Sequence, residues 1–345
     1  MKCIRIHEHG GPEKLIYEEI SVPKIEAGEV LVSVKATSVN HIDLWVRQGL
    51  PGVKFHLPII PGVDAAGVVA EKGDAVTHVK IGDRVVVAQG ISCGHCKHCL
   101  NGNDNLCKDY ILIGEHRDGA DAEYLAVPGR NVLPLSEKIS FEEAAAAALV
   151  FLTAWQMLAD KAQVRPGEDV LVNGVSSGVG SAALQIAKLL GARVIATTST
   201  NEKAAKAREL GADEVINYNR QSTLEEVRRL TGRKGVEVVI DHVGKTVWDQ
   251  NIKSLTKGGR LVTCGATSGF EGITDIRYVF YKQLQILGST MGRKGDLITI
   301  FNFIEQGKLK PVIDRVMPLE ELREAHRFVE EGKHFGKIVL IPQSS

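Results

Sequence analysis

The chain has 345 residues, and its 42 lysines and arginines balance its 42 aspartates and glutamates, so the formal net charge is zero. This length exceeds the usual size of one domain, and we therefore expect two. Zero net charge provides no long-range field to attract a polyanion, so neither nucleic acid nor an anionic membrane is an expected partner. The sequence begins without the apolar run of a signal peptide and lacks a long uncharged apolar stretch, which predicts a cytoplasmic protein.

The N-terminal part of the chain is typical of a β-rich domain. Short segments alternate apolar and polar residues or end at glycines, as half-buried strands do. A helix is then predicted where Ser140 and Glu143 have the spacing of a capping box before an alanine-rich run. This helix is the expected junction between domains. The strand-like segments before it are EVLVSVKATSV (29–39), GVVAEKG (67–73), RVVVAQG (84–90) and GADAEYLAV (119–127).

From Asp169 onward, apolar strand segments alternate with helical patterns. Such alternation predicts a parallel sheet with right-handed crossovers. The chain ends with a helix near 319–330 and a last strand, KIVLIP. The other expected strands are 169–175, 192–199, 213–218, 236–241, 260–265 and 284–290, and the other expected helices are 181–190, 201–210, 222–230 and one after Thr246.

Four of the six cysteines lie in CGHCKHCLNGNDNLC, with the spacing C-x2-C-x2-C-x7-C. Thiols this close in the sequence cannot easily form unstrained disulfides with one another, and in a cytosolic protein they more often bind metal. His95 and His98 lie between the cysteines, so the residue types alone leave the ligand set open. They also leave open whether the metal takes part in chemistry or only orders a loop.

The segment VLVNGVSSGVGSAALQIAKLLGA (170–192) places a glycine turn between a strand and a helix. This is the context of a dinucleotide-binding fingerprint, although Val175 and Ser177 replace the first two glycines of G-x-G-x-x-G. Gly178 and Gly180 let the backbone approach a pyrophosphate, whose oxygens the free N–H groups of the helix start would bind. The predicted cofactor-binding residues of the turn are Ser177, Gly178, Val179 and Gly180.

The next strand, which ends in ATTSTNEK, bears on which dinucleotide binds. A carboxylate about 20 residues beyond the glycine turn normally accepts hydrogen bonds from the adenosine ribose and repels a phosphate there. Thr198 stands near that position, and Lys203 follows with a positive charge. The pattern therefore favours NADPH over NADH, with Lys203 as an ordinary solvated helix charge as the alternative.

A β-rich domain, a junction helix, a dinucleotide-binding domain and a returning C-terminal segment together resemble the medium-chain dehydrogenase/reductase superfamily over essentially all of the chain. The resemblance implies an α/β fold with a GroES-like catalytic domain at 1–135 and 306–345. It also implies a Rossmann doubly wound parallel-sheet NADP-binding domain at 136–305. In zinc-containing alcohol dehydrogenases of this superfamily, a lobe with the same cysteine spacing, here 93–107, binds a structural zinc. One structural Zn²⁺ per subunit is thus implied, with the ligands Cys93, Cys96, Cys99 and Cys107.

Those alcohol dehydrogenases also hold a catalytic zinc, and the matching positions here are Asn40, Val63 and about Leu149. None of the three offers the sulfur or imidazole nitrogen that zinc prefers, so His41 or His56 would have to substitute. The stretches SVNHIDLWVRQG, PGVDAAGVV, FLTAWQML and SSGVGSAALQIAKLLGA instead resemble quinone oxidoreductases and enoyl reductases, which use NADPH without a catalytic metal.

That resemblance implies places for the remaining candidates. Asn40 and Thr153 would touch the nicotinamide end of the cofactor, and Asp43 would support the catalytic centre. An aspartate at 121 is unusual, because relatives commonly have an aromatic residue there. The residues that match positions at the 2′-phosphate are Ser199, Lys203 and Tyr218. Those that match positions beside the nicotinamide ribose or at cofactor-facing strand ends are Val243, Gly244, Cys264, Gly265 and Lys337.

The expected function is NADPH-dependent reduction of a small molecule, either a quinone or an activated C=C bond of an enone or enoyl group. Without a Lewis acid, the alkoxide formed from a simple ketone has little stabilisation, whereas a conjugated acceptor spreads the charge. The proton donor stays open between water, Tyr110, Tyr281, His41 and His242. The alternatives are a zinc-dependent alcohol dehydrogenase with unusual ligands and a non-enzymatic NADPH-binding sensor.

The apolar run LQILGST (284–290) is compatible with pairing of subunits through the edge strands of their cofactor domains, as the resemblance implies. A homodimer or homotetramer is therefore expected.

Overall fold

A computed structural model of the protein describes residues 1–50 and 52–342. The contacts between Cα atoms divide the chain into two compact units. Unit 1 comprises Met1–Leu149 and Arg293–Ser345, and unit 2 comprises Val150–Gly292. The last three residues of the expected segment 306–345 lie outside the described residues.

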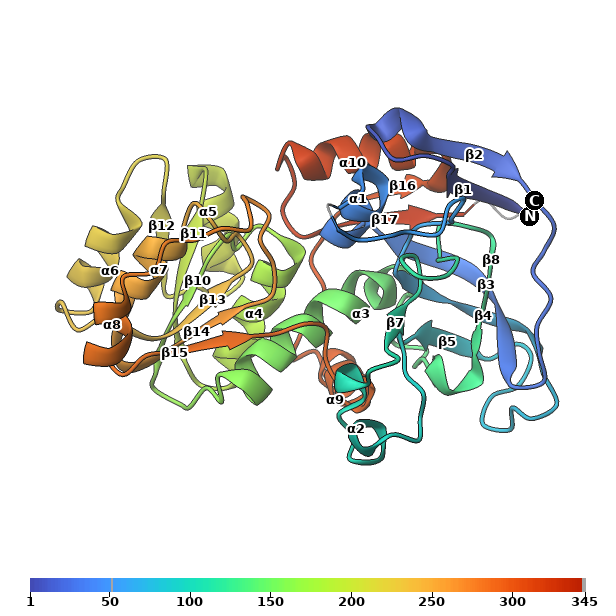
Figure 1. The fold of residues 1–345 in the computed structure, drawn as a ribbon, viewed down its shortest axis with the longest axis horizontal. Coiled ribbons are helices and arrows are strands. Elements are labelled where there is room, and N and C mark those ends of the chain that lie inside the picture. Colours follow the sequence, from blue (N-terminus) through green and yellow to red (C-terminus); the bar gives the residue numbers. More distant parts are fainter. Residues whose placement is uncertain (51, 343–345) are drawn as a thin grey trace. The chain divides into compact units, whose positions relative to one another are not determined.

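Unit 1 is built around β3 (Glu29–Ser38), a long and mostly buried strand. β4 runs antiparallel along one edge of β3, while on the other edge β8 pairs with its first half and β17 with its last residues. The sheet order is β16-β17-β3-β4-β5-β9. The last strand of the chain thus lies beside an early one, seen in Figure 1 as the red β17 next to the blue β3.

Side chains on the inner faces of these strands form a core that is rich in valine, as expected for pleated, buried strands. A second apolar cluster joins the first strands to α1, α10 and β17. The strands of unit 1 are β1 (Lys2–Ile6), β2 (Leu15–Glu19), β3 (Glu29–Ser38), β4 (Asp64–Lys72), β5 (Arg84–Val87), β6 (Gly90–Ile91), β7 (Ile111–Leu112), β8 (Tyr124–Pro128), β9 (Val132–Pro134), β16 (Ile313–Pro318) and β17 (Lys337–Ile341). Its helices are α1 (His41–Gln48), α2 (Lys97–Leu100), the first part of α3 (Phe141–Trp155), α9 (Lys294–Glu305) and α10 (Leu322–Glu330).

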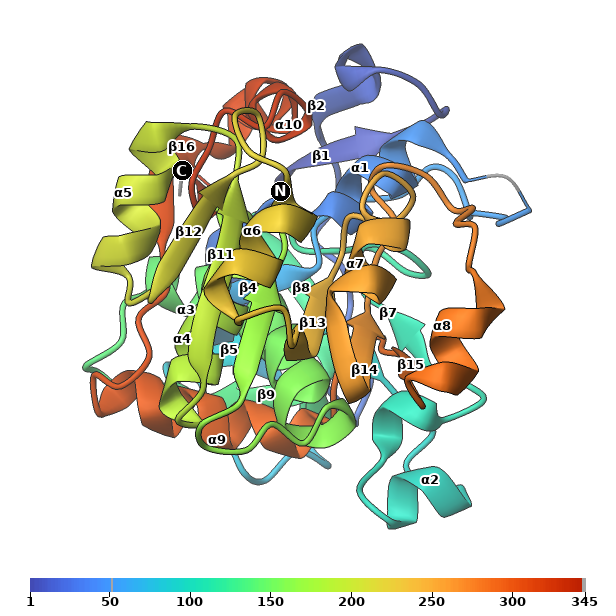
Figure 2. The ribbon, with the colours of Figure 1, turned by 90° about the vertical axis from the view of Figure 1, so that its left-hand side faces the viewer.

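Unit 2 is a six-stranded parallel sheet with the order β12-β11-β10-β13-β14-β15. From β10 the chain adds strands in one direction to β12, and then crosses to add β13 on the other side of β10. Because such crossovers are right-handed, α4 and α5 pack on one face of the sheet and α6 and α7 on the other. Figure 2 shows α6 and α7 side by side, and these two helices contact each other.

The point where the strand order reverses, between β10 and β13, is where doubly wound sheets bind ligands, at the carboxyl ends of the strands. The strands of unit 2 are β10 (Asp169–Val172), β11 (Arg193–Thr198), β12 (Glu214–Asn217), β13 (Val236–Asp241), β14 (Leu255–Thr263) and β15 (Gln285–Gly288). Its helices are the end of α3 with its continuation over Gln156–Lys161, α4 (Gly178–Leu189), α5 (Asn201–Glu209), α6 (Thr223–Leu230), α7 (Trp248–Ser254) and α8 (Ile276–Tyr281).

The predicted alternation of strands and helices after residue 169 is confirmed, because every expected strand and helix of that region is present within a few residues. The predicted capping box is confirmed as well: the Ser140 Oγ accepts from the Glu143 N–H at 3.1 Å, and a Glu143 carboxylate oxygen accepts from the Ser140 N–H at 3.0 Å. Helices α1, α2, α8 and α9 were not predicted. The segment 119–127 forms a strand only from Tyr124, since Ala120 to Ala122 bond to the loop at Pro61 and Gly62 or to each other.

The division between the units differs from the expected boundaries at 135/136 and 305/306. It falls inside α3, because the first part of that helix bonds to unit 1: the Ala145 carbonyl accepts from Ser38 Oγ at 3.0 Å. Helix α9 also belongs to unit 1, where the Lys294 N–H donates to Asp104 at 3.0 Å and Glu305 accepts from Ser136 Oγ at 2.8 Å.

One helical segment, Phe141–Lys161, is long and apolar enough to cross a membrane by length and composition. About 72% of its most apolar window is buried inside the protein. A core helix of a globular protein passes the same test, so this segment is weak evidence for a membrane span.

Candidate functional site

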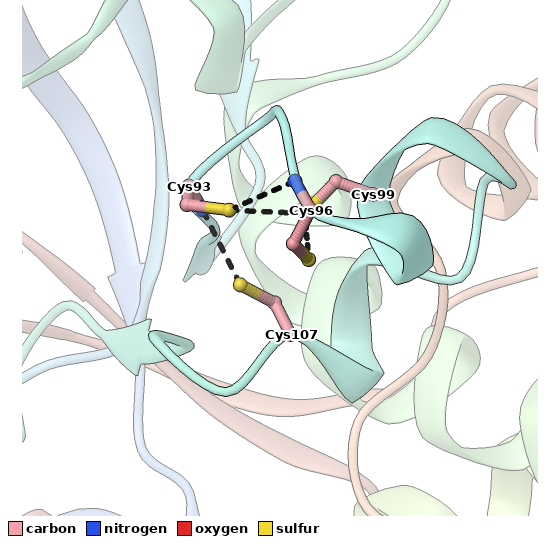
Figure 3. Close-up of side chains that lie close together, drawn as sticks. All are labelled: Cys93, Cys96, Cys99 and Cys107. Atoms are coloured by element: carbon pink, nitrogen blue, oxygen red, sulfur yellow. Dashed lines mark hydrogen bonds between the residues drawn. The ribbon is translucent and has the colours of Figure 1, made fainter.

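The four cysteines of the predicted metal site come together in one group, which we call the cysteine cluster (Cys93, Cys96, Cys99 and Cys107). Cys99 lies in α2 and the other three lie in the segments beside it, and the four Sγ atoms are all within 4.8 Å of one another (Figure 3). Among the described residues, this is the one group of three or more potential metal ligands that are this close. The Sγ atom of Cys99 lies 3.8 Å from that of Cys93 and 3.5 Å from that of Cys96.

These distances fit a tetrahedral zinc centre. With Zn–S bonds of about 2.3 Å, the sulfurs of a tetrahedron are about 3.8 Å apart. Hydrogen bonds also favour ionised sulfur at two positions. The Cys96 N–H donates to Cys93 Sγ at 3.3 Å. Desolvation of the Cys99 thiol is outweighed by hydrogen bonds with Ser92, Gly94 and the other cysteines of the cluster, so the pKa of Cys99 is lowered to about 6. The pKa of Cys93 is lowered too, chiefly through its hydrogen bond with the His95 backbone.

The glycine turn of unit 2 begins α4 as the sequence predicts. Ser177 is the N-cap, and its Oγ accepts from the Gly180 N–H at 2.9 Å. A side chain at Gly180 would meet the Gly174 carbonyl oxygen at 2.4 Å, so only glycine lets the helix approach the strand end this closely. Gly174 has φ +56°, a conformation that suits glycine, which lets the chain turn directly after β10. The turn leaves the helix start available to an anion.

Residues at the carboxyl end of β13 meet this turn across the point where the strand order reverses. His242 Nε2 lies 3.1 Å from Ser177 Oγ and 3.0 Å from the Asn173 carbonyl oxygen. The carboxylate of Asp241 accepts from the N–H groups of Val243 and Gly244, and burial raises the pKa of Asp241 to about 6. The predicted loop at Val243 and Gly244 is therefore held at the same edge of the sheet as Ser177.

Cys264 and Gly265 follow β14 at that edge. The Cys264 N–H donates to the Asp241 carbonyl at 3.0 Å, and Gly265 is close enough to His242 that an added Cβ would lie 3.2 Å from its carbonyl oxygen. Burial raises the pKa of the Cys264 thiol to about 12, so this cysteine is a thiol and no nucleophile at neutral pH. Thr153 is buried in the part of α3 that belongs to unit 2.

Of the four residues predicted near the adenosine end, Thr198, Ser199 and Tyr218 lie at the ends of β11 and β12, and Lys203 lies in the first turn of α5. The Tyr218 N–H donates to the Thr198 carbonyl at 3.0 Å, and Asn219 Nδ2 donates to the Ser199 carbonyl at 2.9 Å, so the two strand ends are joined. The Lys203 N–H donates to Thr200 Oγ1, the N-cap of α5. Thr198 Oγ1 is buried and has no hydrogen-bond partner among the described residues. An orphaned hydroxyl at the carboxyl end of a parallel strand fits a bound ribose or phosphate.

Unit 1 contains a buried polar arrangement around Asp64, the first residue of β4, which is fully buried. Asp64 Oδ2 accepts from Ser38 Oγ at 2.7 Å, from Asn40 Nδ2 at 2.7 Å and from Lys337 Nζ at 3.4 Å. Asp64 Oδ1 accepts from Gln89 Nε2 at 2.9 Å and from the Leu149 N–H at 3.0 Å. We call these groups the Asp64 network (Ser38, Asn40, Asp64, Gln89, the Leu149 N–H and Lys337).

Two of the sequence-predicted residues, Asn40 and Lys337, thus belong to one network in unit 1. Asn40 is 6% exposed and Lys337 is 4% exposed. Lys337 Nζ donates to Asn40 Oδ1 at 2.5 Å and to the Val39 carbonyl at 2.7 Å. Burial lowers the pKa of Lys337, and the carboxylates of Asp64 and Asp43 oppose that shift.

A catalytic zinc does not fit the residues at this place. Val63 and Leu149 carry apolar side chains, and both are buried. Asn40 and Asp64 offer oxygen atoms, but these atoms already accept hydrogen bonds from four nitrogen and oxygen donors and from the Lys337 Nζ. A carboxylate has about four lone-pair sites, so the network leaves Asp64 without a free one for a metal.

Asp43 and Asp121 form a second buried acidic region beside this network. Asp43 Oδ2 accepts from the Asn40 N–H at 2.7 Å, while Asp43 Oδ1 has no partner among the described residues. Burial and then the charge of Asp121 raise the pKa of Asp43 well above its ordinary value. Thr37 Oγ1 donates to Asp121 Oδ1 at 3.0 Å, but burial raises the pKa of Asp121 to about 7. The unusual aspartate is therefore a buried acid with a hydroxyl partner.

The sequence did not predict that Gln89, Ser38 and Asp64 belong to one hydrogen-bond network. Asp64 directly follows Val63, but no pattern in the sequence indicated its hydrogen-bond partners, and Gln89 gave no signal at all. A partial signal existed: a lysine in an otherwise apolar terminal strand must find a buried partner or reach solvent.

The comparisons with known proteins agree with this architecture. Residues 26–137 match the alcohol dehydrogenase GroES-like domain, and residues 178–306 match the zinc-binding dehydrogenase family. An alcohol dehydrogenase of Geobacillus stearothermophilus is 35% identical over 342 residues, 99% of each chain. Human quinone oxidoreductase is 32% identical and covers 99% of this chain and 98% of its own.

A solved structure described as an NAD-dependent alcohol dehydrogenase has 49% sequence identity and a TM-score of 0.96, with 99% of this chain and 100% of that chain covered. Identity of this extent across whole chains shows the family. The chain belongs to the medium-chain dehydrogenase/reductase superfamily, and it is an oxidoreductase of that superfamily. The predicted GroES-like and Rossmann architecture is confirmed.

Proposed function

We propose that the protein transfers hydride from NADPH to a quinone or to the activated C=C bond of an enone or enoyl substrate, without a catalytic metal. When bound, NADPH supplies a hydride to the electron-poor carbon of the acceptor. The enolate or quinol anion that forms takes a proton from water or a nearby acid. A conjugated acceptor spreads the new negative charge, so hydrogen bonds suffice where a simple ketone would need a Lewis acid.

The observation that carries this proposal is the Asp64 network. At the three positions where the resemblance places catalytic zinc ligands, the chain has Asn40, Val63 and Leu149. The oxygens near them accept hydrogen bonds from Lys337, Ser38, Gln89 and the Leu149 N–H. These hydrogen-bond donors oppose metal binding, because a cation would have to displace them.

The structural metal belongs to the proposal as well. We propose one Zn²⁺ per subunit in the cysteine cluster, where four thiolates would complete the tetrahedron and leave no position for substrate. Thiolate ligands persist in a reducing compartment, which supports a cytoplasmic location.

The proposed preference for NADPH rests on the adenosine end of unit 2. Thr198 brings a hydroxyl where a carboxylate would repel the 2′-phosphate, and its Oγ1 lacks a partner among the described residues. Lys203 adds a positive charge at the start of α5, and Tyr218 is half exposed at the end of β12.

A second candidate function is alcohol oxidation with NAD⁺. It is favoured by the 49% identity to the solved structure described as an NAD-dependent alcohol dehydrogenase. On the proposed function, this chain would differ from such a protein in its cofactor and in its substrate.

The first experiment is elemental analysis of metal purified with the protein, combined with a substrate panel. We expect one zinc per chain, NADPH oxidation at 340 nm with 1,4-benzoquinone or 2-cyclohexen-1-one, and little reduction of NAD⁺ with ethanol or 2-propanol. Two zincs per chain with alcohol oxidation would replace the proposal by the second candidate. Tight binding of NADPH without turnover on the whole panel would instead support the sensor.

Lys203→Glu tests the cofactor preference, with Lys206→Glu on the same helix as the matched control. Both variants make the same change of charge, but only position 203 is proposed to meet the 2′-phosphate. We expect Lys203→Glu to raise the KM for NADPH roughly 10-fold or more, since one charge-assisted hydrogen bond contributes about 1.5–3 kcal/mol. The KM for NADH should change little in either variant. Equal effects of the two variants on NADPH would remove Lys203 from the site.

We also propose that the protein is a homodimer or homotetramer. β15 is the last strand in the sheet order of unit 2 among the described residues, and its Ile286 is 40% exposed. Nearby on α8, Ile276 and Phe280 are 71% and 67% exposed. An open strand edge beside exposed apolar side chains suits pairing with a second copy. Light scattering after size exclusion should give an oligomer for the native chain and for Ile298→Lys on α9, and a smaller species for Ile286→Lys.

A further inference from the structure

Lys337 holds three oxygen atoms with one amino group. Its Nζ lies 2.7 Å from the Val39 carbonyl, 2.5 Å from Asn40 Oδ1 and 3.4 Å from Asp64 Oδ2. An ammonium has three N–H groups and no lone pair, and it therefore matches three acceptors. A neutral amine would bring one lone pair toward an oxygen. The arrangement indicates that Lys337 is charged and serves as the counter-charge of the buried Asp64 carboxylate.

The same contacts fix the orientation of the Asn40 side-chain amide. Asn40 Nδ2 donates to Asp64 Oδ2 at 2.7 Å and to the Ser38 carbonyl at 3.2 Å, while its Oδ1 accepts from Lys337. If the amide were turned over, its N–H₂ group would face the ammonium and its oxygen would face the carboxylate. Both of these contacts are repulsive, so Lys337 and Asp64 together allow one orientation only.

The network also joins segments that are distant in the sequence. Lys337 lies at the start of β17, and it contacts the junction of β3 with α1 at Val39 and Asn40 and the start of β4 at Asp64. Asp64 in turn accepts from the Leu149 N–H in α3. These are the segments on which positions 40, 63 and 149 lie, the positions at which the resemblance would place the ligands of a catalytic metal.

We propose that Lys337 supplies the buried positive charge of unit 1. It is a positioning residue that orients the Asn40 amide and, with Asp64, holds together the three segments that contain positions 40, 63 and 149. This inference rests on the proposed metal-free function. A metal ion in such a place would attract oxygen and nitrogen atoms from several segments and so fix their geometry. Here the Lys337 ammonium does so through three hydrogen bonds. The side-chain polar atoms of Asn40 and Asp64 are hydrogen-bonded to this ammonium, to each other or to the other groups of the network.

A purely structural ion pair would predict a different response to mutation. In that case, removing both charges together would restore the stability and the activity that were lost when one charge was removed, because a buried ion pair can be replaced by neutral groups. If Lys337 positions Asn40, the doubly neutral protein would regain stability but still lack the donor that holds Asn40 Oδ1.

The test compares Lys337→Met, Lys337→Arg and the double variant Lys337→Met with Asp64→Asn. Lys72→Met is the control, because Lys72 is also in unit 1, and its ammonium also donates to a backbone carbonyl, that of Val76, at 2.8 Å. The readouts are the melting temperature, kcat and KM with each substrate, zinc per chain, and deuterium uptake of peptides covering residues 37–48.

We expect Lys337→Met to melt at lower temperature, to lose kcat roughly 10- to 100-fold, as for a misplaced active-site group, and to take up deuterium faster across 37–48. The double variant should recover the melting temperature but not kcat or the deuterium protection. Lys337→Arg should keep more kcat than Lys337→Met. Zinc should stay at one per chain in all variants, and Lys72→Met should behave as the native protein.

Recovery of both kcat and protection in the double variant would overturn the proposal, and so would native behaviour of Lys337→Met. If Lys337→Met fails to fold, the double and Arg variants still decide. Failure of the proposed function is seen separately. If the native protein oxidises alcohols with a single zinc, the Lys337 variants are assayed on alcohols. If it has no turnover, the role of Lys337 is tested by the deuterium uptake. A second zinc per native chain would overturn both proposals.

Discussion

The cysteine cluster and the Asp64 network both bring segments of unit 1 together, the first around the proposed zinc ion and the second around the Lys337 ammonium. The cluster is local: its four sulfurs come from residues 93–107 and lie within 4.8 Å of one another, with Cys107 buried and the other three half-buried. The network is non-local: its lysine and asparagine are separated by 297 positions and its side chains are buried. Local ligands of one type suit a metal, and mixed donors and acceptors from distant segments suit hydrogen bonds around an ammonium.

This difference shows that hydrogen bonds can occupy the polar atoms at a position that the resemblance matches to a metal site. The polar atoms at residues 40 and 64 have partners for nearly all of their lone pairs and protons, which is the condition for burying a charge. Four variants test the two regions, and they are ordered here from the largest expected effect to the smallest.

Replacing two sulfurs should break the cysteine cluster. Cys93→Ser with Cys107→Ser removes half of the proposed zinc ligands, and zinc per chain should fall from one to near zero. Structural zinc sites contribute about 10–16 kcal/mol in peptides. Loss of the zinc should therefore lower the free energy of unfolding by more than about 3 kcal/mol, which corresponds to a decrease in melting temperature of about 6–12 °C or more. Elemental analysis and calorimetry measure both. A protein that keeps its zinc would show that other ligands hold the metal.

Asp121→Asn tests, through its pH dependence, the buried acidic region beside the Asp64 network. The ordinary pKa of 3.8 is raised to about 7 by burial, so the folded protein binds the proton more tightly than the unfolded chain. Stability from this group is therefore present at low pH and is lost as the pH rises from about 4 to about 7. Asparagine cannot ionise, so the variant should gain about 1.4 kcal/mol per pH unit over the native protein in that window, or about 4 kcal/mol in all.

Denaturant unfolding at pH 5 and at pH 8 measures the gain of Asp121→Asn. The difference in unfolding free energy between variant and native protein should be larger at pH 8. A difference that is constant with pH would mean that Asp121 does not titrate in this range. Zinc content should be unchanged, because the cysteine cluster is a separate site.

Gln89→Met removes one donor from Asp64 Oδ1 and keeps the length of the side chain. A hydrogen bond to a charged group contributes about 1.5–3 kcal/mol, and the Leu149 N–H continues to bind the same oxygen. The loss of unfolding free energy in the variant should be at the lower end of that range. Gln89 Oε1 has no partner among the described residues, so its removal is favourable. Chemical denaturation measures the change, and an unaltered midpoint would show that Asp64 is satisfied without Gln89.

The double variant His95→Gln with His98→Gln should have the smallest effect. His95 Nδ1 lies 3.0 Å from the Cys93 carbonyl oxygen, and four sulfurs already complete a tetrahedron. Zinc per chain should stay at one, and the melting temperature should change by less than about 2 °C. Loss of zinc in this variant would bring a histidine into the ligand set.

Local patterns in the sequence determined much of this protein. The period of apolar residues predicts the strands and helices after residue 169, and the Ser140–Glu143 spacing predicts the start of α3. The cysteine spacing predicts a cluster whose sulfurs do meet. In each case the interacting residues are near neighbours in the chain, so backbone geometry alone brings them together.

Tertiary structure alone decided the partners of Asn40, Asp64 and Lys337, the hydroxyl that binds Asp121, and the point at which the chain divides inside α3. Thr37 and Asp121 are 84 positions apart, and Lys337 is 297 from Asn40. No periodicity encodes such a contact, because it depends on strand order and register, which follow from how the whole core packs. The sequence shows that a lysine stands in the last strand, and only the folded sheet shows which buried carboxylate it meets.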